Sequence, residues 1–329
     1  DENSNQDDIN GKSFTGMVNV YSNAKLALYT ESILNGTDPV LKDNLVPVKV
    51  ASDGTVTKAD LYQEWYNYEN KEWANAVILK DETITYSNGD IIPESNIESY
   101  FVWIPRYKYQ IFDDGVNATT KQLINITFES KDTTKSNGTT KGEWLTHPAF
   151  TFGDNQVKGF WIGKYELSSE TPTATDGGGS STTLTARILP NVNSWRNNNV
   201  SNFSTVIQSM QTTNNIYGLS TDRSLADSHM LTNMEWGAVA YLTNSNYGRC
   251  SGGTCTEITI NNCSTYITGI GADTVSASSS STTCTTDANK YNGAKGVLAS
   301  TTGNVYGVYD MSGGAFEYVM GNMSSTADS

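Results

Sequence analysis

The stretch that decides the fold reads GVYDMSGGAFEY and spans residues 307–318. Asp310, Gly313, Ala315 and Glu317 are spaced so that a glycine-rich loop can curl back and bring two carboxylates and two backbone carbonyls together. Ca²⁺ prefers about six to eight oxygen ligands of these kinds. The spacing predicts a Ca²⁺ site, with Asp310, Gly313, Ala315 and Glu317 as metal ligands. The alternative is that Asp310 caps the turn and Glu317 forms a salt bridge.

Four other segments precede this stretch in a fixed order. They are FVWIP at 101–105, GFWIGKYELS at 159–168, PNVNSW at 190–195 and MLTNMEW at 230–236. With residues 307–318 they resemble, in the same order, the opening strand, the F-x-I-x-K-x-E-V-T strand, the P-V-x-x-V-S-W element, the R-L-P-T-E-A-E-W helix start and the G-L-Y-D-M-x-G-N-V-W-E-W turn of the formylglycine-generating-enzyme (sulfatase-modifying factor) family. The resemblance covers the chain from Tyr100 onward. It implies a C-type-lectin-like fold with Ca²⁺ at the late turn.

The sequence departs from this family in ways that bear on activity. Met230 stands where the family has Arg, and Gly314 stands where it has Asn. The family's Arg-Gly-Gly strand and catalytic cysteines lie downstream of the position matched by Glu317. This chain ends twelve residues after Glu317. We therefore expect no enzymatic activity and no catalytic residues, with a C-terminally incomplete domain.

The expected fold class is α+β: a C-type-lectin-like domain over residues 100–329, preceded by an N-terminal helix and a small β-region. Residues 1–12 are polar and are expected to be a disordered tail. Residues 13–99 form the expected pilin-like stalk. It begins with an amphipathic helix over residues 13–34, which Asn35-Gly36 and Pro39 end. The start at DENSNQDD indicates a trimmed product whose targeting segment was removed.

Short strands are expected across residues 40–100. Leu45–Val50 alternates between apolar and polar residues, and Asp53-Gly54 predicts a hairpin turn. Strands are also expected at Glu64–Tyr68 and Trp73–Leu79, with a turn at residues 87–90. Further strands are expected in the aromatic run Tyr100–Phe112 and at Gly159–Tyr165.

Two helices are predicted further along the chain. Ser201–Gln211 has apolar residues at helical spacing. Thr232 and Glu235 form a capping-box pattern, in which the Thr hydroxyl and the Glu carboxylate bond to each other's backbone N–H. This pattern predicts a helix from Asn233 to about Thr243.

The chain carries 7 Trp, 18 Tyr and 9 Phe, which can supply a core although only 37% of its residues are hydrophobic. Two aromatic groups also suggest carbohydrate stacking, but a core or sheet-face role is favoured because strand aromatics usually pack inward. The groups are Trp65, Tyr66 and Tyr68, and Trp103, Tyr107 and Tyr109.

The cysteines indicate an oxidising compartment. All four lie in one polar region, where an even number of cysteines reads as two disulfides with three alternative pairings: Cys250, Cys255, Cys263 and Cys284. A zinc site is the weaker alternative, since no His lies nearby. The net charge of −14 excludes a typical nucleic-acid partner, because phosphate binding needs a basic surface.

The two histidines do not suggest catalysis. We expect His147, before Pro148, to be a surface or turn residue and His229 to be structural, since Ser228 and Asp227 are only sequence neighbours. No acidic pair is singled out for glycoside hydrolysis.

These features predict an extracellular or cell-surface, ligand-binding or adhesion protein without catalysis. The pattern also resembles pilin-like surface proteins of gut bacteria related to Gram-positive organisms, some of which carry a retroelement-diversified binding surface. Its partners would be an unknown surface ligand, protein or glycan, or further copies of the chain in a filament. The alternatives are an enzyme of the formylglycine-generating type lacking its catalytic C-terminal segment, and a purely structural filament subunit.

Overall fold

The structure is a computed structural model that describes residues 38–41, 44–111, 123–129, 142–152, 154–212, 215, 217–222, 226–272, 284 and 286–320. The expected tail at 1–12 and helix at 13–34 lie outside these residues.

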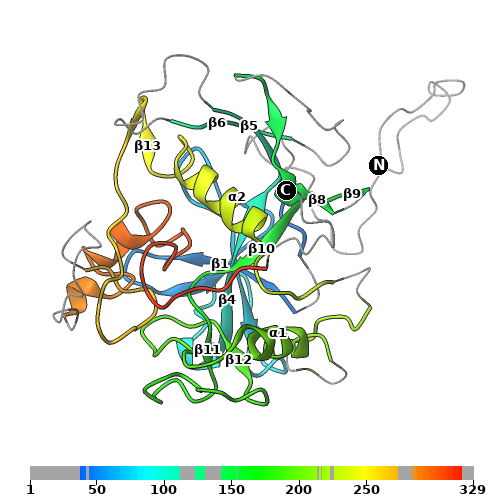
Figure 1. Ribbon diagram of the computed structural model, residues 1–329, viewed down its shortest axis with the longest axis vertical. Coiled ribbons are helices and arrows are strands. Elements are labelled where there is room, and N and C mark those ends of the chain that lie inside the picture. The colour runs from blue at the N-terminus through cyan, green and yellow to red at the C-terminus, as the bar shows by residue number, and fades with distance from the viewer. Residues whose placement is uncertain are drawn as a thin grey trace, which may run out of the picture.

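A five-stranded antiparallel sheet forms the centre of the molecule (Figure 1). Its strands, in spatial order, are β10 (Gly159–Gly163), β4 (Ile97–Pro105), β3 (Asn75–Leu79), β1 (Val46–Val50) and β2 (Val56–Lys58). The expected boundary between residues 99 and 100 falls inside β4. In the described chain, the small β-region and the following segment therefore share one sheet, because β3 and β10 pair with opposite edges of β4.

Smaller elements surround this sheet. A three-stranded sheet has the order β6-β5-β7, and three two-stranded ribbons and two helices complete the regular structure. The bounds are β5 Tyr107–Gln110, β6 Asn125–Phe128, β7 Leu145–Thr146, β8 Thr151–Phe152, β9 Asn155–Gln156, β11 Ser168–Ser169, β12 Ala186–Arg187, α1 Val200–Ser209, α2 Asn233–Thr243, β13 Cys250–Ser251 and β14 Thr254–Cys255. Short 3₁₀ turns lie at Glu94–Asn96, Pro148–Phe150, Asp287–Asn289 and Gly296–Ala299. The fold class is thus α+β, as expected, with mostly small antiparallel sheets and few helices.

Most of the predicted local elements are confirmed. The Asp53-Gly54 turn joins β1 to β2, where the positive φ of Gly54 (89°) suits a residue without Cβ. The aromatic run Tyr100–Phe112 contributes two strands, β4 and β5, which are separated at Arg106. Helix α2 begins at the predicted capping box: Thr232 Oγ1 accepts from the Glu235 N–H at 3.2 Å, and Glu235 Oε2 accepts from the Thr232 N–H at 2.8 Å.

The strand predicted at Glu64–Tyr68 is wrong. This segment is irregular and pairs only through an isolated bridge between Asn67 and Glu72. Trp65, Tyr66 and Tyr68 are all buried, whereas a strand would point neighbouring side chains to opposite faces. The backbone of this segment is therefore irregular because that conformation lets adjacent aromatic rings be buried together.

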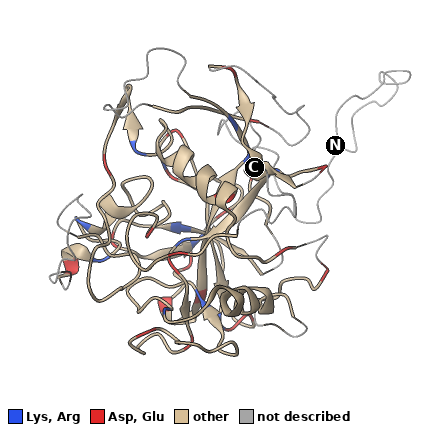
Figure 2. Cartoon of the chain, in the orientation of Figure 1, with Lys and Arg blue, Asp and Glu red and all other residues tan. Residues whose placement is uncertain are grey.

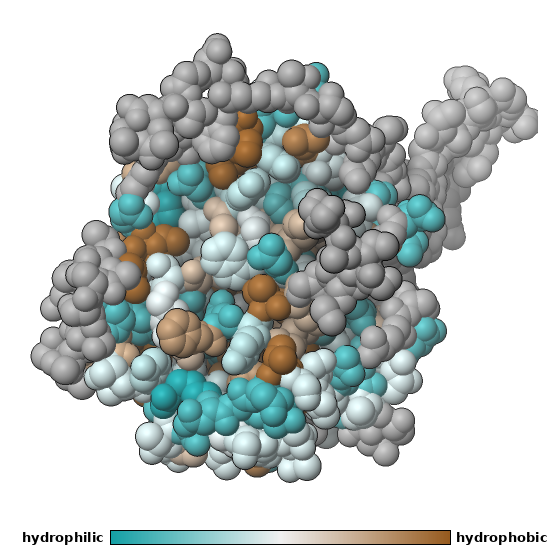
Figure 3. All heavy atoms as spheres, in the orientation of Figure 1, coloured by the Kyte–Doolittle hydropathy of each residue, from teal (hydrophilic) through white to brown (hydrophobic). Residues whose placement is uncertain are grey.

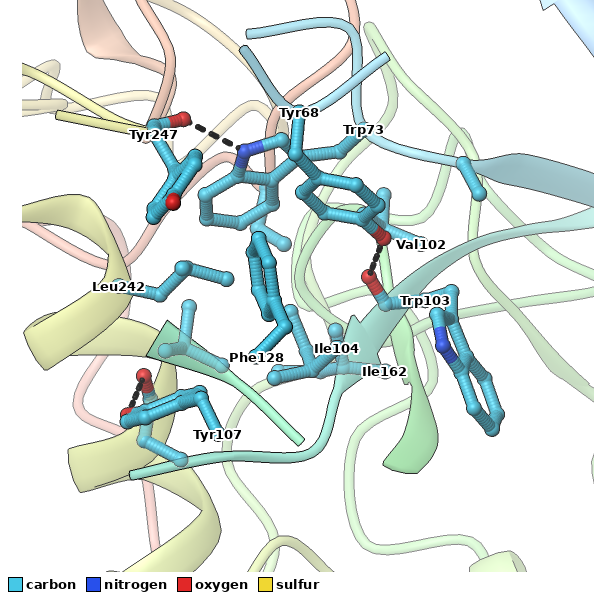
Figure 4. Close-up of a cluster of buried hydrophobic side chains, with 14 of the residues drawn as sticks. Tyr68, Trp73, Val102, Trp103, Ile104, Tyr107, Phe128, Ile162, Leu242 and Tyr247 are labelled. Atoms are coloured by element: carbon cyan, nitrogen blue, oxygen red, sulfur yellow. Dashed lines mark hydrogen bonds between the residues drawn. The ribbon is translucent and has the colours of Figure 1, made fainter. Parts of the chain in front are cut away.

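The aromatic groups form the core instead of an exposed stacking surface (Figure 4). Trp73 and Tyr107 are fully buried, and Trp73 Nε1 donates to the Tyr247 carbonyl at 2.8 Å. The Tyr68 hydroxyl donates to the Trp103 carbonyl at 2.9 Å. The polar atoms of Trp73 and Tyr68 are thus satisfied although their rings are buried. The carbohydrate-stacking alternative for these two groups is wrong, since only Tyr109 remains half-buried.

The rest of the described chain after α2, residues 244–272 and 286–320, is mostly irregular and is called here the C-terminal layer (yellow to red in Figure 1). Lys164 connects it to the sheet. This side chain follows β10, is fully buried, and donates from Nζ to Asn75 Oδ1 and to the Val305 carbonyl, both at 2.6 Å. Burial lowers the pKa of Lys164 well below its ordinary value.

Candidate functional site

The segment 307–318 crosses the C-terminal layer and is anchored to the sheet at its start. The Tyr309 N–H donates to the Lys164 carbonyl at 2.8 Å. Asp310, Gly313 and Gly314 all have positive φ, at 60°, 88° and 77°. A Cβ on residue 314 would lie 2.8 Å from Glu166 Cδ, so glycine is required by both space and backbone conformation. The Gly314 departure from the family pattern thus makes room for a buried glutamate.

Asp310 is buried beneath this turn and holds three segments together. Its carboxylate accepts from the Gly269 N–H at 2.9 and 3.0 Å, from Asn261 Nδ2 at 2.9 Å and from the Glu166 N–H at 3.2 Å. Burial raises the pKa of Asp310, and these hydrogen bonds oppose the rise. Where the sequence predicted a turn cap, Asp310 therefore links three distant segments of the chain through hydrogen bonds.

Glu166 is the site residue that the sequence reasoning missed. Its Oε1 accepts from the Ala315 N–H at 2.8 Å, while its buried Oε2 receives no hydrogen bond of normal geometry, although the buried Ser194 hydroxyl lies beside this carboxylate. Burial, followed by repulsion from Asp310 and Glu317, raises the pKa of Glu166 well above its ordinary value. The sequence signal that could have identified it is its place in the segment 159–168, where Glu166 matches the Glu of the F-x-I-x-K-x-E-V-T pattern.

Glu317 completes a group that we call the carboxylate cluster: Glu166, Asp310 and Glu317. Its residue as a whole is exposed, yet partial burial of the carboxyl group and the neighbouring Asp310 raise its pKa to about 7. A hydrogen bond with the Trp236 side chain opposes this rise. In the described chain, no basic side chain forms a salt bridge with Glu317. The salt bridge expected as an alternative is therefore not formed there.

The carboxylate cluster contains oxygen atoms that suit a cation. Glu166 Oε2 and Asn261 Oδ1 are both buried oxygens without a hydrogen bond, which is the kind of donor that Ca²⁺ prefers. Across the described ranges, however, no three His, Cys, Asp or Glu side chains are grouped closely enough to hold a metal ion by themselves. The predicted Ca²⁺ site stays a prediction, and any such site would need carbonyl or amide oxygens.

The turn carries two exposed aromatic side chains above this buried base. Phe316 is fully exposed and Tyr318 is 53% exposed. The Tyr318 ring lies 6.4 Å from that of Phe203 on α1, and the Met320 N–H donates to the Leu231 carbonyl at 2.9 Å. On this front face, apolar residues lie singly among polar ones (Figure 3). Exposed aromatic rings are common anchors of binding surfaces.

The two histidines have structural positions. His147 is buried, not exposed, and its Nδ1 accepts from the Ala149 N–H at 3.3 Å as the cap of a 3₁₀ turn; burial lowers its pKa to about 4. The surface part of its prediction is wrong because Tyr107 and Tyr241 pack against the ring, and the turn part is confirmed.

His229 bridges two carboxylates. Nδ1 lies 2.9 Å from Asp227 Oδ2, and Nε2 lies 3.1 Å from Glu235 Oε2. The hydrogen bond with Glu235 raises the pKa of His229, while burial opposes it. Both of these partners are carboxylates and neither is a hydroxyl or thiol nucleophile. Because Glu235 lies in the first turn of α2, its contact with His229 stabilises the start of this helix.

The cysteines form the two predicted disulfides. Cys250 pairs with Cys255 across the β13–β14 ribbon, and Cys263 pairs with Cys284. Disulfides of this kind are compatible with an oxidising, extracellular environment. Within the described residues, every helix is too short or too polar to span a bilayer. Charged residues are few and scattered along the described chain (Figure 2).

Comparison with known proteins adds no relative. No protein-family model matches the chain, and neither the curated proteins nor the solved structures contain a match. The formylglycine-generating-enzyme resemblance therefore remains a prediction, and the candidate site has to be interpreted from its own geometry.

Proposed function

We propose that this chain is a surface-displayed, ligand-binding protein that acts without catalysis. The observation that carries the proposal is the pairing of exposed Phe316 and Tyr318 with a turn fixed from below by Asp310 and Glu166. Exposed aromatic residues on a rigid base bind partners with little loss of conformational entropy. The two disulfides support display outside the cell.

We further propose that Ca²⁺ stabilises this turn. Glu166 Oε2 and Glu317 would supply carboxylate oxygens, and Asn261 Oδ1 and the carbonyls of Gly313 and Ala315 would supply neutral ones. The ion would offset the repulsion among the carboxylates of the cluster, which burial makes costly. Asp310 would act mainly by holding the loop, since it already accepts hydrogen bonds from three groups.

Display and binding are tested together in cells that produce the protein. Antibody should label intact cells, and brief protease treatment of the cells should remove the label. Beads coated with the purified chain should adhere to the partner surface, and Phe316→Ala/Tyr318→Ala should abolish adhesion without changing the Tm. Ile91→Ala, another exposed apolar residue, is the matched control and should keep adhesion.

Catalysis and Ca²⁺ have separate readouts. Conversion of cysteine to formylglycine in a peptide substrate, read by mass spectrometry, would contradict the non-catalytic proposal. A chelator should lower the Tm, and added Ca²⁺ should restore it. An unchanged Tm would sink the Ca²⁺ part while leaving the adhesion result intact.

A further inference from the structure

A separate cleft of about 240 Å³ lies away from the carboxylate cluster. Four segments far apart in the sequence supply its walls: the turn after Tyr68, strand β6, the residues before β7, and the loop after α2. Clefts that hold drug-sized ligands measure about 300–1,000 Å³, so this one suits a single small ring.

The floor of the cleft is held rigidly by the aromatic core. The Tyr247 ring lies 4.6 Å from the ring of Phe128, and its carbonyl accepts from Trp73 Nε1. Trp144 is half-buried and lies beneath Lys108, whose Nζ is 5.6 Å from the ring centroid. Trp144 thus offers a partly exposed indole to the cleft, while the Tyr247 ring is buried in the core beneath it. Neither ring belongs to the aromatic groups that the sequence suggested for stacking.

The remaining polar lining consists of one carboxylate and two carboxamides: Glu69, Asn125 and Asn246. All three residues are exposed, and Asn125 Nδ2 donates to Gln110 Oε1 at 3.1 Å, which orients that carboxamide. A carboxamide both donates and accepts, and a carboxylate accepts twice. Together they match adjacent hydroxyl groups, each of which also donates and accepts.

The charge of the cleft selects against anions. None of its seven lining residues is cationic, one is acidic, and the whole chain carries −14. Lys108 lies over Trp144, but the acidic Glu69 and the net charge of −14 disfavour an anion. A ligand with one apolar face, several hydroxyl groups and no charge fits both the indole and the polar rim.

We infer that this cleft binds one neutral hexopyranose residue of a glycan, with Trp144 against its C–H face and Glu69, Asn125 and Asn246 on its hydroxyl groups. The inference deepens the proposed ligand-binding function and rests on it for its biological purpose. The binding chemistry stands on the cleft alone.

The test uses the full chain with glucose, galactose, mannose and N-acetylglucosamine as probes. Saturation-transfer NMR with each sugar at about 10 mM detects dissociation constants on the order of 1 mM. At least one sugar should receive saturation at its ring C–H protons. Trp144→Ala should lower the affinity for that sugar at least about tenfold. Phe152→Ala, which changes an exposed aromatic residue outside the cleft, should leave this affinity unchanged.

Two exposed polar positions keep the test valid if Trp144→Ala fails to fold. Asn246→Ala and Glu69→Gln should each lower the affinity for the same sugar several-fold and leave the Tm of the protein unchanged. The inference is overturned if none of the four sugars binds the wild type, or if these variants bind the sugar as well as the wild type does. Adhesion lost in Phe316→Ala/Tyr318→Ala but kept in Trp144→Ala would retain the proposed function and remove the glycan cleft from it.

Discussion

The central sheet and the C-terminal layer keep their backbones in place by different means. In the sheet, neighbouring strands satisfy each other's N–H and C=O groups, and aromatic and aliphatic side chains fill both faces. In the C-terminal layer, buried side chains satisfy backbone groups one at a time: Asn261 and Asp310 from within the layer, and Lys164 from the end of β10. The difference teaches that substitution in the sheet costs mainly packing, whereas substitution in the layer costs specific hydrogen bonds.

The largest effect is expected in the core behind the sheet. Trp73→Ala removes a fully buried indole and its hydrogen bond to Tyr247, and should lower the free energy of unfolding by about 3–5 kcal/mol. Urea unfolding followed by circular dichroism measures this change. A cost no greater than that of the exposed control Phe152→Ala would break the distinction between the two regions.

The disulfides should rank next. Cys263→Ala/Cys284→Ala releases a bond between residues 21 apart, and about 2–4 kcal/mol of stability should be lost. Cys250→Ala/Cys255→Ala releases a bond between residues only 5 apart and should cost less, because a shorter loop restrains the unfolded chain less. Thermal unfolding of the two double variants gives the ranking, and the reverse order would contradict it.

A single amide in the C-terminal layer should also matter. Asn261→Ala removes hydrogen bonds from Nδ2 to the Ile267 carbonyl and to Asp310 Oδ1, and should cost about 1–3 kcal/mol. Hydrogen exchange at the Gly269 amide, which donates to Asp310, should speed up in the same variant. Asn292→Ala, whose one bond lies at the surface, is the control and should have little effect.

His229 should make stability depend on pH. Its pKa is raised in the folded state, so its contribution is fully present below the ordinary value of 6.5 and is lost as the pH rises through the folded pKa. His229→Gln should lower the free energy of unfolding more at pH 5.5 than at pH 8.5. Equal losses at both pH values, measured by urea unfolding, would show that charge has no part in this contact.

The smallest expected effect belongs to Glu317. Its folded pKa of about 7 lies above the ordinary 4.5, so the folded state holds more protons between these values and stability falls as the pH rises through that window. Glu317→Gln should flatten this slope, and Ca²⁺ should flatten it in the wild type. Tm measured from pH 4.5 to 7.5 checks both, with Glu257→Gln as an acidic control outside the cluster.

Local patterns in the sequence were good guides where a few neighbouring residues decide the backbone. The capping box at Thr232, the turn at Asp53-Gly54 and the strands at Leu45–Val50 and Gly159–Tyr165 are confirmed because each depends on short-range geometry. The two disulfides were also expected, although spacing could not choose among the pairings.

Tertiary contacts set the limits of that reasoning. Glu64–Tyr68 has strand-forming residues, but three of its aromatic rings are buried in the same core, which a regular strand would not allow. His147 was expected in a turn, yet only the fold brings Tyr107 and Tyr241 around it. Glu166 joins Asp310 and Glu317 across about 150 residues of sequence, a distance that no local pattern spans. The sequence could therefore locate the candidate site by its turn, but it could not identify Glu166 as a member of the carboxylate cluster.

The connection from Lys164 to Val305 also sets the order in which this protein can fold. Strand β4 can pair with β3 early, but β10 and the buried amine reach their places only after much longer stretches of chain have emerged. Contacts so distant in sequence slow folding and leave intermediates exposed. During synthesis the sheet would carry an unsatisfied Lys164 until the Val305 region arrives.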